Sequence, residues 1–144
     1  MTESQVFNSS LEAGVRAISF LNSYFPESLD FEHLIIIDYV LVNSADFGGP
    51  ESLHPETPNR QGELSSRRAV VRDGLDLMKR FGLIEIELSS HGVFYRVTEE
   101  AEPYLCLMRE QYSLHLKNVA SWLSNEVKVF GFERLNMIVE KKVF

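Results

Sequence analysis

The chain has 144 residues, of which 44% are hydrophobic and 24% are charged, and this is the composition of one ordinary globular domain. Its formal net charge of −7 argues against a protein that binds nucleic acid through bulk positive charge. The single cysteine excludes an internal disulfide, and no apolar run approaches the ~20 residues of a membrane span, so we expect a cytoplasmic protein that does not enter a membrane.

The charge is distributed unevenly along the chain. Residues 1–59 contain nine acidic residues and one basic residue, a balance of −8, whereas residues 60–82 carry +3 and residues 83–144 carry −2. We therefore predict an acidic N-terminal part that meets a basic partner, beside one basic segment. The acidic residues in question are Glu27, Asp30, Glu32, Asp38 and Asp46.

Two helices are predicted before residue 43. Ser9 and Glu12 form a capping box that begins the first helix, and Pro26 ends it. The predicted core face of this helix carries Leu11, Val15, Ile18, Leu21 and Phe25. Asp30 caps the second helix, which we place over residues 31–42, although its β-branched run also suits a strand.

The segment from Asn43 to Gly62 is rich in residues that break regular structure. It contains Gly48, Gly49 and Pro50, followed by prolines at positions 55 and 58. A loop of this length inside a compact domain is uncommon, and it is usually functional or disordered. Because the prolines restrict the backbone, we predict an ordered binding or docking loop.

A third helix is predicted over residues 63–80, followed by Gly82, and Arg67, Val71, Leu75 and Met78 line one of its faces. Two alternating runs with a turn between them then predict a β-hairpin over about 83–97. Three helices followed by a hairpin is the order of a winged helix–turn–helix domain, with the third helix as recognition helix and the hairpin as wing.

We therefore predict an α+β, mostly α fold: a winged helix–turn–helix domain over 1–97, with a long ordered loop between its second and third helices, and a C-terminal helical extension over 98–144. In the extension, Thr98 caps a short helical turn and Pro103 begins a new segment. A long amphipathic helix over 111–130 ends at Gly131, and a last short helix follows. Trp122 lies on a second apolar stripe of the long helix, which favours burial against a partner.

The basic third helix has two interpretations. Arg68 and Arg72 share one face, so with Lys79 and Arg80 they are placed for contacts with phosphates or base edges. The alternative is a protein-facing or salt-bridged surface, because acidic residues are interleaved along the helix and one hairpin strand is acidic. We favour the second interpretation, and direct DNA contact stays open.

No residue pattern points to catalysis or to a bound metal. The four histidines lack metal-ligand spacing, and His54, next to Pro55, suits a hydrogen-bonding residue of an ordered loop. Cys106 has no partner for nucleophilic chemistry and lies in an apolar stretch, so we expect it in the core. The expectation is a non-enzymatic protein without a cofactor or metal.

The centre of the sequence resembles a known family. The resemblance lies in G-G-P at 48–50, S-L-H-P at 52–55, R-x-G-E-L at 60–64 and the pair at 67–68, with further matches along the third helix. This pattern resembles the winged helix middle component of bacterial ABC-type three-component conflict systems, the architecture to which Lamassu-type anti-phage systems belong. It spans about Leu29 to Val97 and includes the long loop.

The resemblance implies a small accessory subunit that bridges an SMC-like or ABC-type ATPase and an effector, often a nuclease, of the same operon. The resemblance implies no catalytic residue. It implies that the subunit contacts DNA indirectly, through the complex. With Trp122 added from its apolar stripe, the candidate partner-interface residues are Ser52, Leu53, His54, Pro55, Arg60, Glu63, Arg67 and Trp122. The alternative is a dimeric winged helix DNA-binding transcriptional regulator that uses Arg68 and Arg72.

Overall fold

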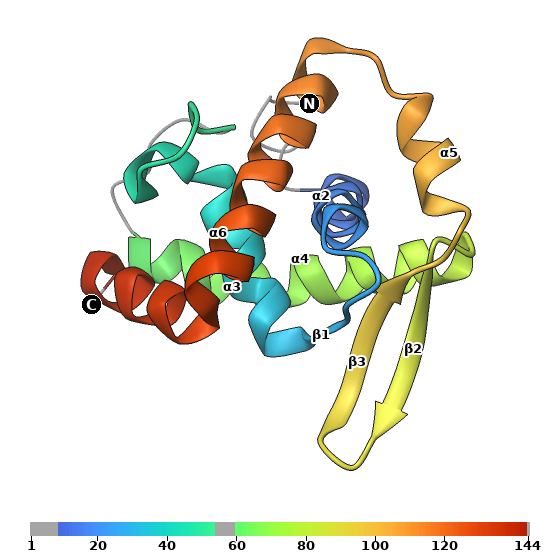
Figure 1. Cartoon of the computed structure of the whole chain (residues 1–144), viewed down its shortest axis with the longest axis horizontal. Helices are drawn as coiled ribbons and strands as arrows, with labels where there is room; N and C mark the ends of the chain where they lie inside the picture. Colours follow the sequence, from blue (N-terminus) through green and yellow to red (C-terminus); the bar gives the residue numbers. More distant parts are fainter. Residues whose placement is uncertain (1–8, 54–59, 144) are drawn as a thin grey trace.

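The computed structural model describes residues 9–53 and 60–143 (Figure 1). It is a mostly helical α+β structure with a small three-stranded antiparallel sheet. The elements follow one another as α2 (Ser10–Ser23), β1 (Leu29–Asp30), α3 (Phe31–Val42), the 3-10 helix η1 (Ser44–Phe47), α4 (Arg60–Arg80), β2 (Ile84–Ser89), β3 (Gly92–Val97), α5 (Ala101–Cys106) and α6 (Gln111–Val143).

The helix α2 lies at the centre of the molecule and is surrounded by α3, α4, α5 and α6 (Figure 1). Every residue from Ala13 to Leu21 is buried, so the helix has no solvent-facing side over that length. The predicted single core face was wrong at its two ends, because Leu11 and Phe25 are 46% and 55% exposed. A helix that is buried all round must find an internal partner for any charge that it carries.

The predicted caps of the first two helices are confirmed. The Ser9 hydroxyl accepts a hydrogen bond from the Glu12 backbone N–H at 3.1 Å. The Asp30 carboxylate accepts one from the His33 N–H at 2.9 Å, and the segment after it is a helix rather than a strand. In both cases one side chain satisfies a backbone donor that the first helical turn leaves unpaired.

The sheet has the strand order β1-β3-β2, so β3 pairs with both neighbours. The predicted hairpin is confirmed, with Ile84 opposite Val97 and Ser89 opposite Gly92. The short strand β1 was not predicted, and its Leu29 pairs with Tyr95. Ile84 and Val97 are buried at the base of the hairpin, whose far end projects away from the helices (Figure 1).

The C-terminal helices depart from the prediction in two details. Pro103 lies inside α5 instead of beginning a new segment, which is tolerated because the first helical turn needs no donor there. Glu100 is the residue at the N-cap of α5, while the Thr98 hydroxyl caps the turn just before the helix: it accepts from the Glu100 N–H at 3.3 Å and donates to the Gly82 carbonyl at 2.6 Å. Cys106 is exposed at the end of α5 and is not a core residue.

Gly131 interrupts α6 as predicted. Its φ of 82° and ψ of 165° are not helical, so the helix changes direction there (Figure 1). The main apolar stripe before it, which includes Leu116, Val119 and Leu123, belongs to the same buried core as α2, α3 and α4. That stripe is therefore buried within this chain, and the predicted division at residue 97 stays a prediction.

The helices α2 and α4 cross with their backbones in close contact at Gly14 and Gly74. A Cβ atom added to Gly74 would lie 2.6 Å from the Gly14 nitrogen and 2.7 Å from the Ser10 carbonyl oxygen. A Cβ atom on Gly14 would lie 2.8 Å from the Gly74 carbonyl oxygen. Neither helix therefore has room for a side chain at the crossing point.

We predict that Gly74→Ala lowers the free energy of unfolding by about 1–3 kcal/mol, because the added methyl group pushes α2 and α4 apart. In an exposed helix the same change stabilises by about 1 kcal/mol, so the sign of the effect is diagnostic. Urea unfolding followed by circular dichroism measures it. Asp73→Ala, at the exposed neighbouring position, is the matched control, and a stabilised Gly74→Ala variant would contradict the crossing.

Candidate functional site

Three charged side chains from three helices meet inside the molecule. Arg16 of α2 donates from Nε to the Asp38 carboxylate of α3 at 2.6 Å, and Arg67 of α4 donates from Nη1 to its other oxygen at 2.8 Å. Arg16, Asp38 and Arg67 are only 0%, 4% and 5% exposed. We call these three residues the buried arginine cluster.

The electrostatics of the buried arginine cluster depend on its geometry. Burial by itself raises the pKa of Asp38, but the two guanidinium groups and their hydrogen bonds hold that pKa below its ordinary value. Tyr112 of α6 completes the arrangement with its hydroxyl 3.5 Å from Arg16 Nη1, and its own pKa is raised, mainly by burial. The carboxylate therefore stays ionised and joins α2, α3 and α4.

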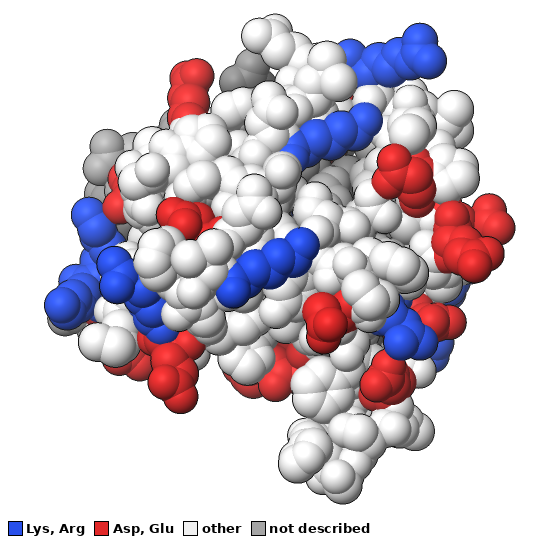
Figure 2. All heavy atoms as spheres, in the orientation of Figure 1, with Lys and Arg blue, Asp and Glu red and all other residues white. Residues whose placement is uncertain are grey.

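The predicted acidic surface of the N-terminal part is largely engaged within the chain. Asp38 lies inside, so it cannot meet a partner, and this element of the prediction was wrong. Asp30 contacts the His33 ring at 2.7 Å, and Glu32 forms a bidentate pair with Arg68 at 2.8 and 2.9 Å. Acidic and basic side chains are interspersed over the visible surface rather than separated (Figure 2).

The basic residues of α4 whose side chains the structure describes divide into three groups. Arg67 belongs to the buried arginine cluster, on the core face that the sequence pattern predicted for it. Arg68 and Arg72 both lie over the Phe31 ring, with guanidinium carbons 5.3 and 4.8 Å from its centroid. Lys79 and Arg80 are exposed in the last turn of α4. The four candidate nucleic-acid contacts therefore do not form one continuous cluster.

The described part of the long loop is ordered against η1 and α6. The Ser44 hydroxyl donates to the Pro50 carbonyl at 2.8 Å, and the Ser52 hydroxyl accepts from the Ala45 N–H at 3.1 Å. His115 of α6 contacts the Glu51 carbonyl through Nε2 at 2.6 Å. The predicted order of this segment is thus confirmed for residues 43–53, which pack on their own chain, and its predicted binding role stays a prediction.

Trp122 and the loop are brought together at Gly49. A Cβ atom added to Gly49 would lie 2.6 to 2.7 Å from three carbons of the indole ring, so the glycine packs flat against it. Leu53 also packs on the core. Trp122 further lines a cavity of about 240 Å³ at the bend of α6, whose lining includes Phe47, Trp122, Val127, Phe130, Arg134 and Leu135.

The structure describes the remaining candidate interface residues only in part. His54 and Pro55 are outside the described residues. Arg60 and Glu63 stand in the first turns of α4, where only the backbone is described. Their assignment to a partner interface stays a prediction.

Comparison with known families identifies the chain. The model of the family described as "ABC-three component (ABC-3C) system Middle Component 2" matches residues 6–144. The chain belongs to this family. Its membership confirms the resemblance at family level, and a middle component works together with other components of its system. No curated protein and no solved structure is detectably similar to the chain.

Two kinds of feature are absent from the described residues of this middle component. No group of three or more His, Cys, Asp and Glu side chains within residues 9–53 and 60–143 is placed to hold a metal ion. None of the helices in these same ranges is long and apolar enough to cross a membrane.

Sequence reasoning missed Arg16 and Asp38 as a pair. Each is a charged residue in the middle of a helix, with immediate neighbours that are mostly apolar, and Arg16 is the one lysine or arginine before position 60. Because two long apolar helices bury most of their surface, a charge of each sign in their middles is the signal that they pair. His115 carried no comparable signal, since its partner is a backbone carbonyl 64 residues away.

We predict that Asp38→Asn lowers the free energy of unfolding by about 3–5 kcal/mol, because it leaves two buried guanidinium groups without a counter-charge. The side chain keeps its size, so the effect reports charge and not volume. Glu32→Gln removes the carboxylate of an exposed pair and is the matched control, with little expected change. Guanidinium chloride unfolding at pH 7 measures both variants.

The stability difference between wild type and Asp38→Asn should depend on pH. Since the pKa of Asp38 is lowered in the folded state, its stabilising contribution is complete above the ordinary value of 3.8 and is lost as the pH falls through the folded-state pKa. The difference in stability between wild type and Asp38→Asn should therefore be constant from about pH 5 to 8 and shrink below about pH 4. A difference that grows on acidification contradicts this assignment.

We predict that Gly49→Ala moves the loop away from α6 and shifts the emission of Trp122 to longer wavelength, because the methyl group takes the space of the indole ring. Trp122 is the single tryptophan of the chain, so the tryptophan emission comes from the ring against which Gly49 packs. Glu51→Ala keeps the carbonyl that His115 contacts and is the control. An unchanged Gly49→Ala spectrum would contradict the docked loop.

Proposed function

We propose that the chain is a non-enzymatic accessory subunit of a bacterial, Lamassu-like anti-phage defence complex in the cytoplasm, and that it links an SMC-like or ABC-type ATPase to an effector, often a nuclease. The single observation that carries this proposal is the match to the middle component 2 family over residues 6–144. The family description supports a subunit that acts with other components, while the identity of the ATPase and effector is part of the proposal.

We propose further that residues up to Val97 form a winged helix domain. The element order α2-β1-α3-α4-β2-β3 supports this, as does the pairing of β3 between β1 and β2. In this arrangement α4 occupies the place of the recognition helix, and β2 and β3 form the wing. The segment between α3 and α4, which contains η1 and the docked loop, is the departure from the common plan.

A non-enzymatic role is supported by how the buried charges are used. Arg16, Asp38 and Arg67 bind one another, and Tyr112 closes the arrangement from α6. Their donors and acceptors therefore organise the helices. The described half of the loop, with Ser52 and Leu53, docks on its own chain and holds the start of the segment that carries the family pattern.

The alternative, a dimeric DNA-binding regulator, is supported by the exposure of Arg72, Lys79 and Arg80 on α4. Two observations weigh against it. Arg68 is occupied by Glu32 in a bidentate pair, and residues 88–95 at the end of the hairpin include no lysine or arginine. The end of the wing therefore lacks the lysine and arginine contacts to phosphate that supply most DNA affinity, and Arg96, nearer its base, is paired with Glu85 and Glu87.

We predict that the chain co-purifies with an ATPase and an effector encoded beside it when the three are co-expressed and only this chain is tagged. Size-exclusion chromatography with mass spectrometry measures the composition of the complex. Elution of the tagged chain alone would contradict the accessory role.

The regulator hypothesis makes a different prediction for the isolated chain. It requires a homodimer that shifts one operator sequence, with a steep salt dependence that Arg72→Ala weakens. We expect no sequence-selective shift from the isolated chain. If Arg72→Ala instead weakens DNA binding equally for every DNA sequence, Arg72 contacts phosphates only and reads no operator.

A further inference from the structure

The strand β2 is an unpaired edge of the sheet. It pairs with β3 alone, because β1 lies on the other side of β3. Residues Glu85 to Ser89 are all exposed. In Figure 1 the hairpin projects beyond the helices, and no described segment runs along the outer side of β2. Such an edge offers backbone hydrogen-bonding groups to an incoming strand.

The register shows which backbone groups face outward. The Thr98 N–H donates to the Leu83 carbonyl at 3.0 Å, which makes Ile84 and Val97 a non-hydrogen-bonded pair. The pattern alternates, so Glu85 and Glu87 exchange hydrogen bonds with β3. The N–H and C=O groups of Ile86 and Leu88 therefore point away from β3, toward the open edge.

The two faces of the hairpin carry different side chains. On one face, Ile86, Leu88 and Val93 are 36%, 76% and 44% exposed. On the other face, Glu85 and Glu87 flank Arg96 at 2.8 and 3.1 Å. This second face continues into a cleft of about 470 Å³ that is lined in part by Glu85, Glu99, Glu100 and Arg96. One face is therefore apolar, and the other has more carboxylates than cations.

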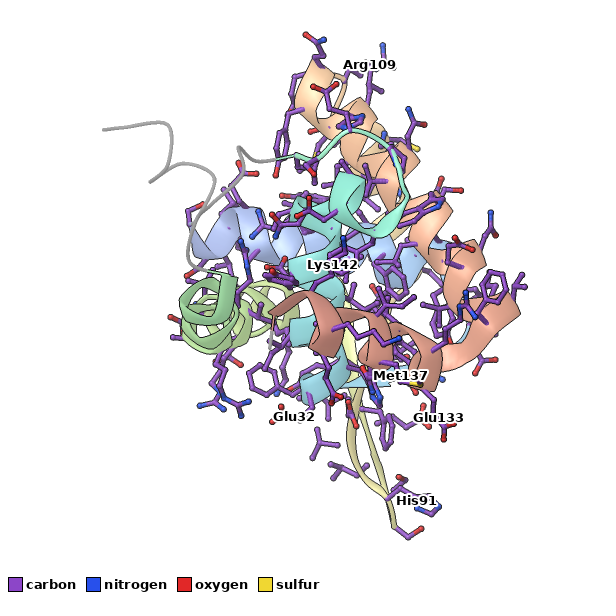
Figure 3. All side chains as sticks on the ribbon, turned by 90° about the vertical axis from the view of Figure 1, so that its left-hand side faces the viewer. Glu32, His91, Arg109, Glu133, Met137 and Lys142 are labelled. Carbon is purple, nitrogen blue, oxygen red and sulfur yellow. The ribbon has the colours of Figure 1, made fainter. Side chains whose placement is uncertain are left out.

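The charge pattern decides between possible occupants. DNA does not fit, since the residues from Leu88 to Tyr95 include no lysine or arginine. His91 marks this end of the hairpin in Figure 3, far from the helices, and the projecting end of the hairpin is white in Figure 2, where lysines, arginines and carboxylates are coloured. A second copy paired antiparallel about Ile86 would place Glu85 opposite Glu87 of that copy, and such like-charge pairs are unfavourable.

We propose that the edge of β2 binds an extended segment of another component of the system, in which apolar and basic side chains alternate. The segment adds as a strand through the backbone groups of Ile86 and Leu88. Its apolar side chains cover the exposed face of the hairpin, and its lysines or arginines lie toward Glu85 and Glu87. This inference rests on the proposed function, because it requires a partner from the same system.

Hydrogen exchange at single-residue resolution tests the backbone part of the proposal. In the free chain the amides of Ile86 and Leu88 should exchange rapidly, whereas those of Glu85 and Glu87 are already bonded to β3. In the co-expressed complex, Ile86 and Leu88 should slow by about tenfold or more, as expected for newly formed hydrogen bonds. A complex that leaves both amides fast overturns the inference and leaves the proposed function intact.

Two variants test the same edge by affinity, each measured by competition with wild type for the co-expressed components. Ile86→Pro removes an outward N–H, which an edge strand tolerates, and also shortens one apolar side chain, and it should weaken binding about tenfold. Ile86→Val shortens the same side chain but keeps the N–H, and it should not weaken binding. Glu87→Lys keeps the backbone and should also weaken binding by repelling a basic side chain. Glu140→Lys, at an exposed position of α6, controls for net charge.

The outcomes separate the possible occupants. Wild-type affinity of both Ile86→Pro and Glu87→Lys overturns the inference. If the wild-type chain forms a homodimer that Ile86→Pro abolishes, the occupant of the edge is a second copy, and the inference is overturned. Protection of the Ile86 amide by duplex DNA alone overturns the inference as well. If the wild-type chain binds no component at all, the proposed function fails first, and this inference fails with it.

Discussion

The guanidinium group of Arg16 is the constraint on which the rest of the structure depends. It lies in the middle of a helix that is buried on every side, so it cannot reach water. An unpaired charge there costs several kcal/mol, which is comparable with the whole ~5–15 kcal/mol stability of a domain. The helix α3 must therefore place Asp38 against it, and Arg67 and Tyr112 fix α4 and α6 to the same point. The cluster thus specifies which helices pack together, and in which register.

This constraint changes the meaning of the charge distribution. By sequence, the first 59 residues are strongly acidic and the third helix is basic. In the structure, Asp38 pairs with Arg67 as well as with Arg16 inside, while Glu32 pairs with Arg68 at the surface. Two carboxylates of the acidic part are therefore paired with two arginines of the basic helix. Net charge counted along a sequence overstates what an outside partner meets, because it counts charges that are paired within the chain.

Features decided by neighbouring residues were predicted well from the sequence, whereas contacts between residues far apart in the chain were not. The caps at Ser9 and Asp30, the alternation of the hairpin and the break at Gly131 are each decided within a few residues. The strand β1 is two residues long and exists only because β3 lies beside it. The periodicity of α4 placed Arg67 on the core face but could not name its partner, 29 residues away. The contact of the loop with α6 joins residues still farther apart in the sequence, since Glu51 and His115 are separated by 64 residues.

A subunit that joins two partners needs two surfaces held at a fixed separation. The base of the hairpin, through Ile84 and Val97, belongs to the same core as the stripe of α6 that adjoins Trp122. The cluster around Arg16 prevents α2, α3 and α4 from sliding within that core, because sliding would separate buried charges. The open edge of β2 and the loop surface on α6 are therefore both attached to one continuous core. For the proposed linking role, the two surfaces are joined through packed helices and paired buried charges, and not through a linker of irregular chain.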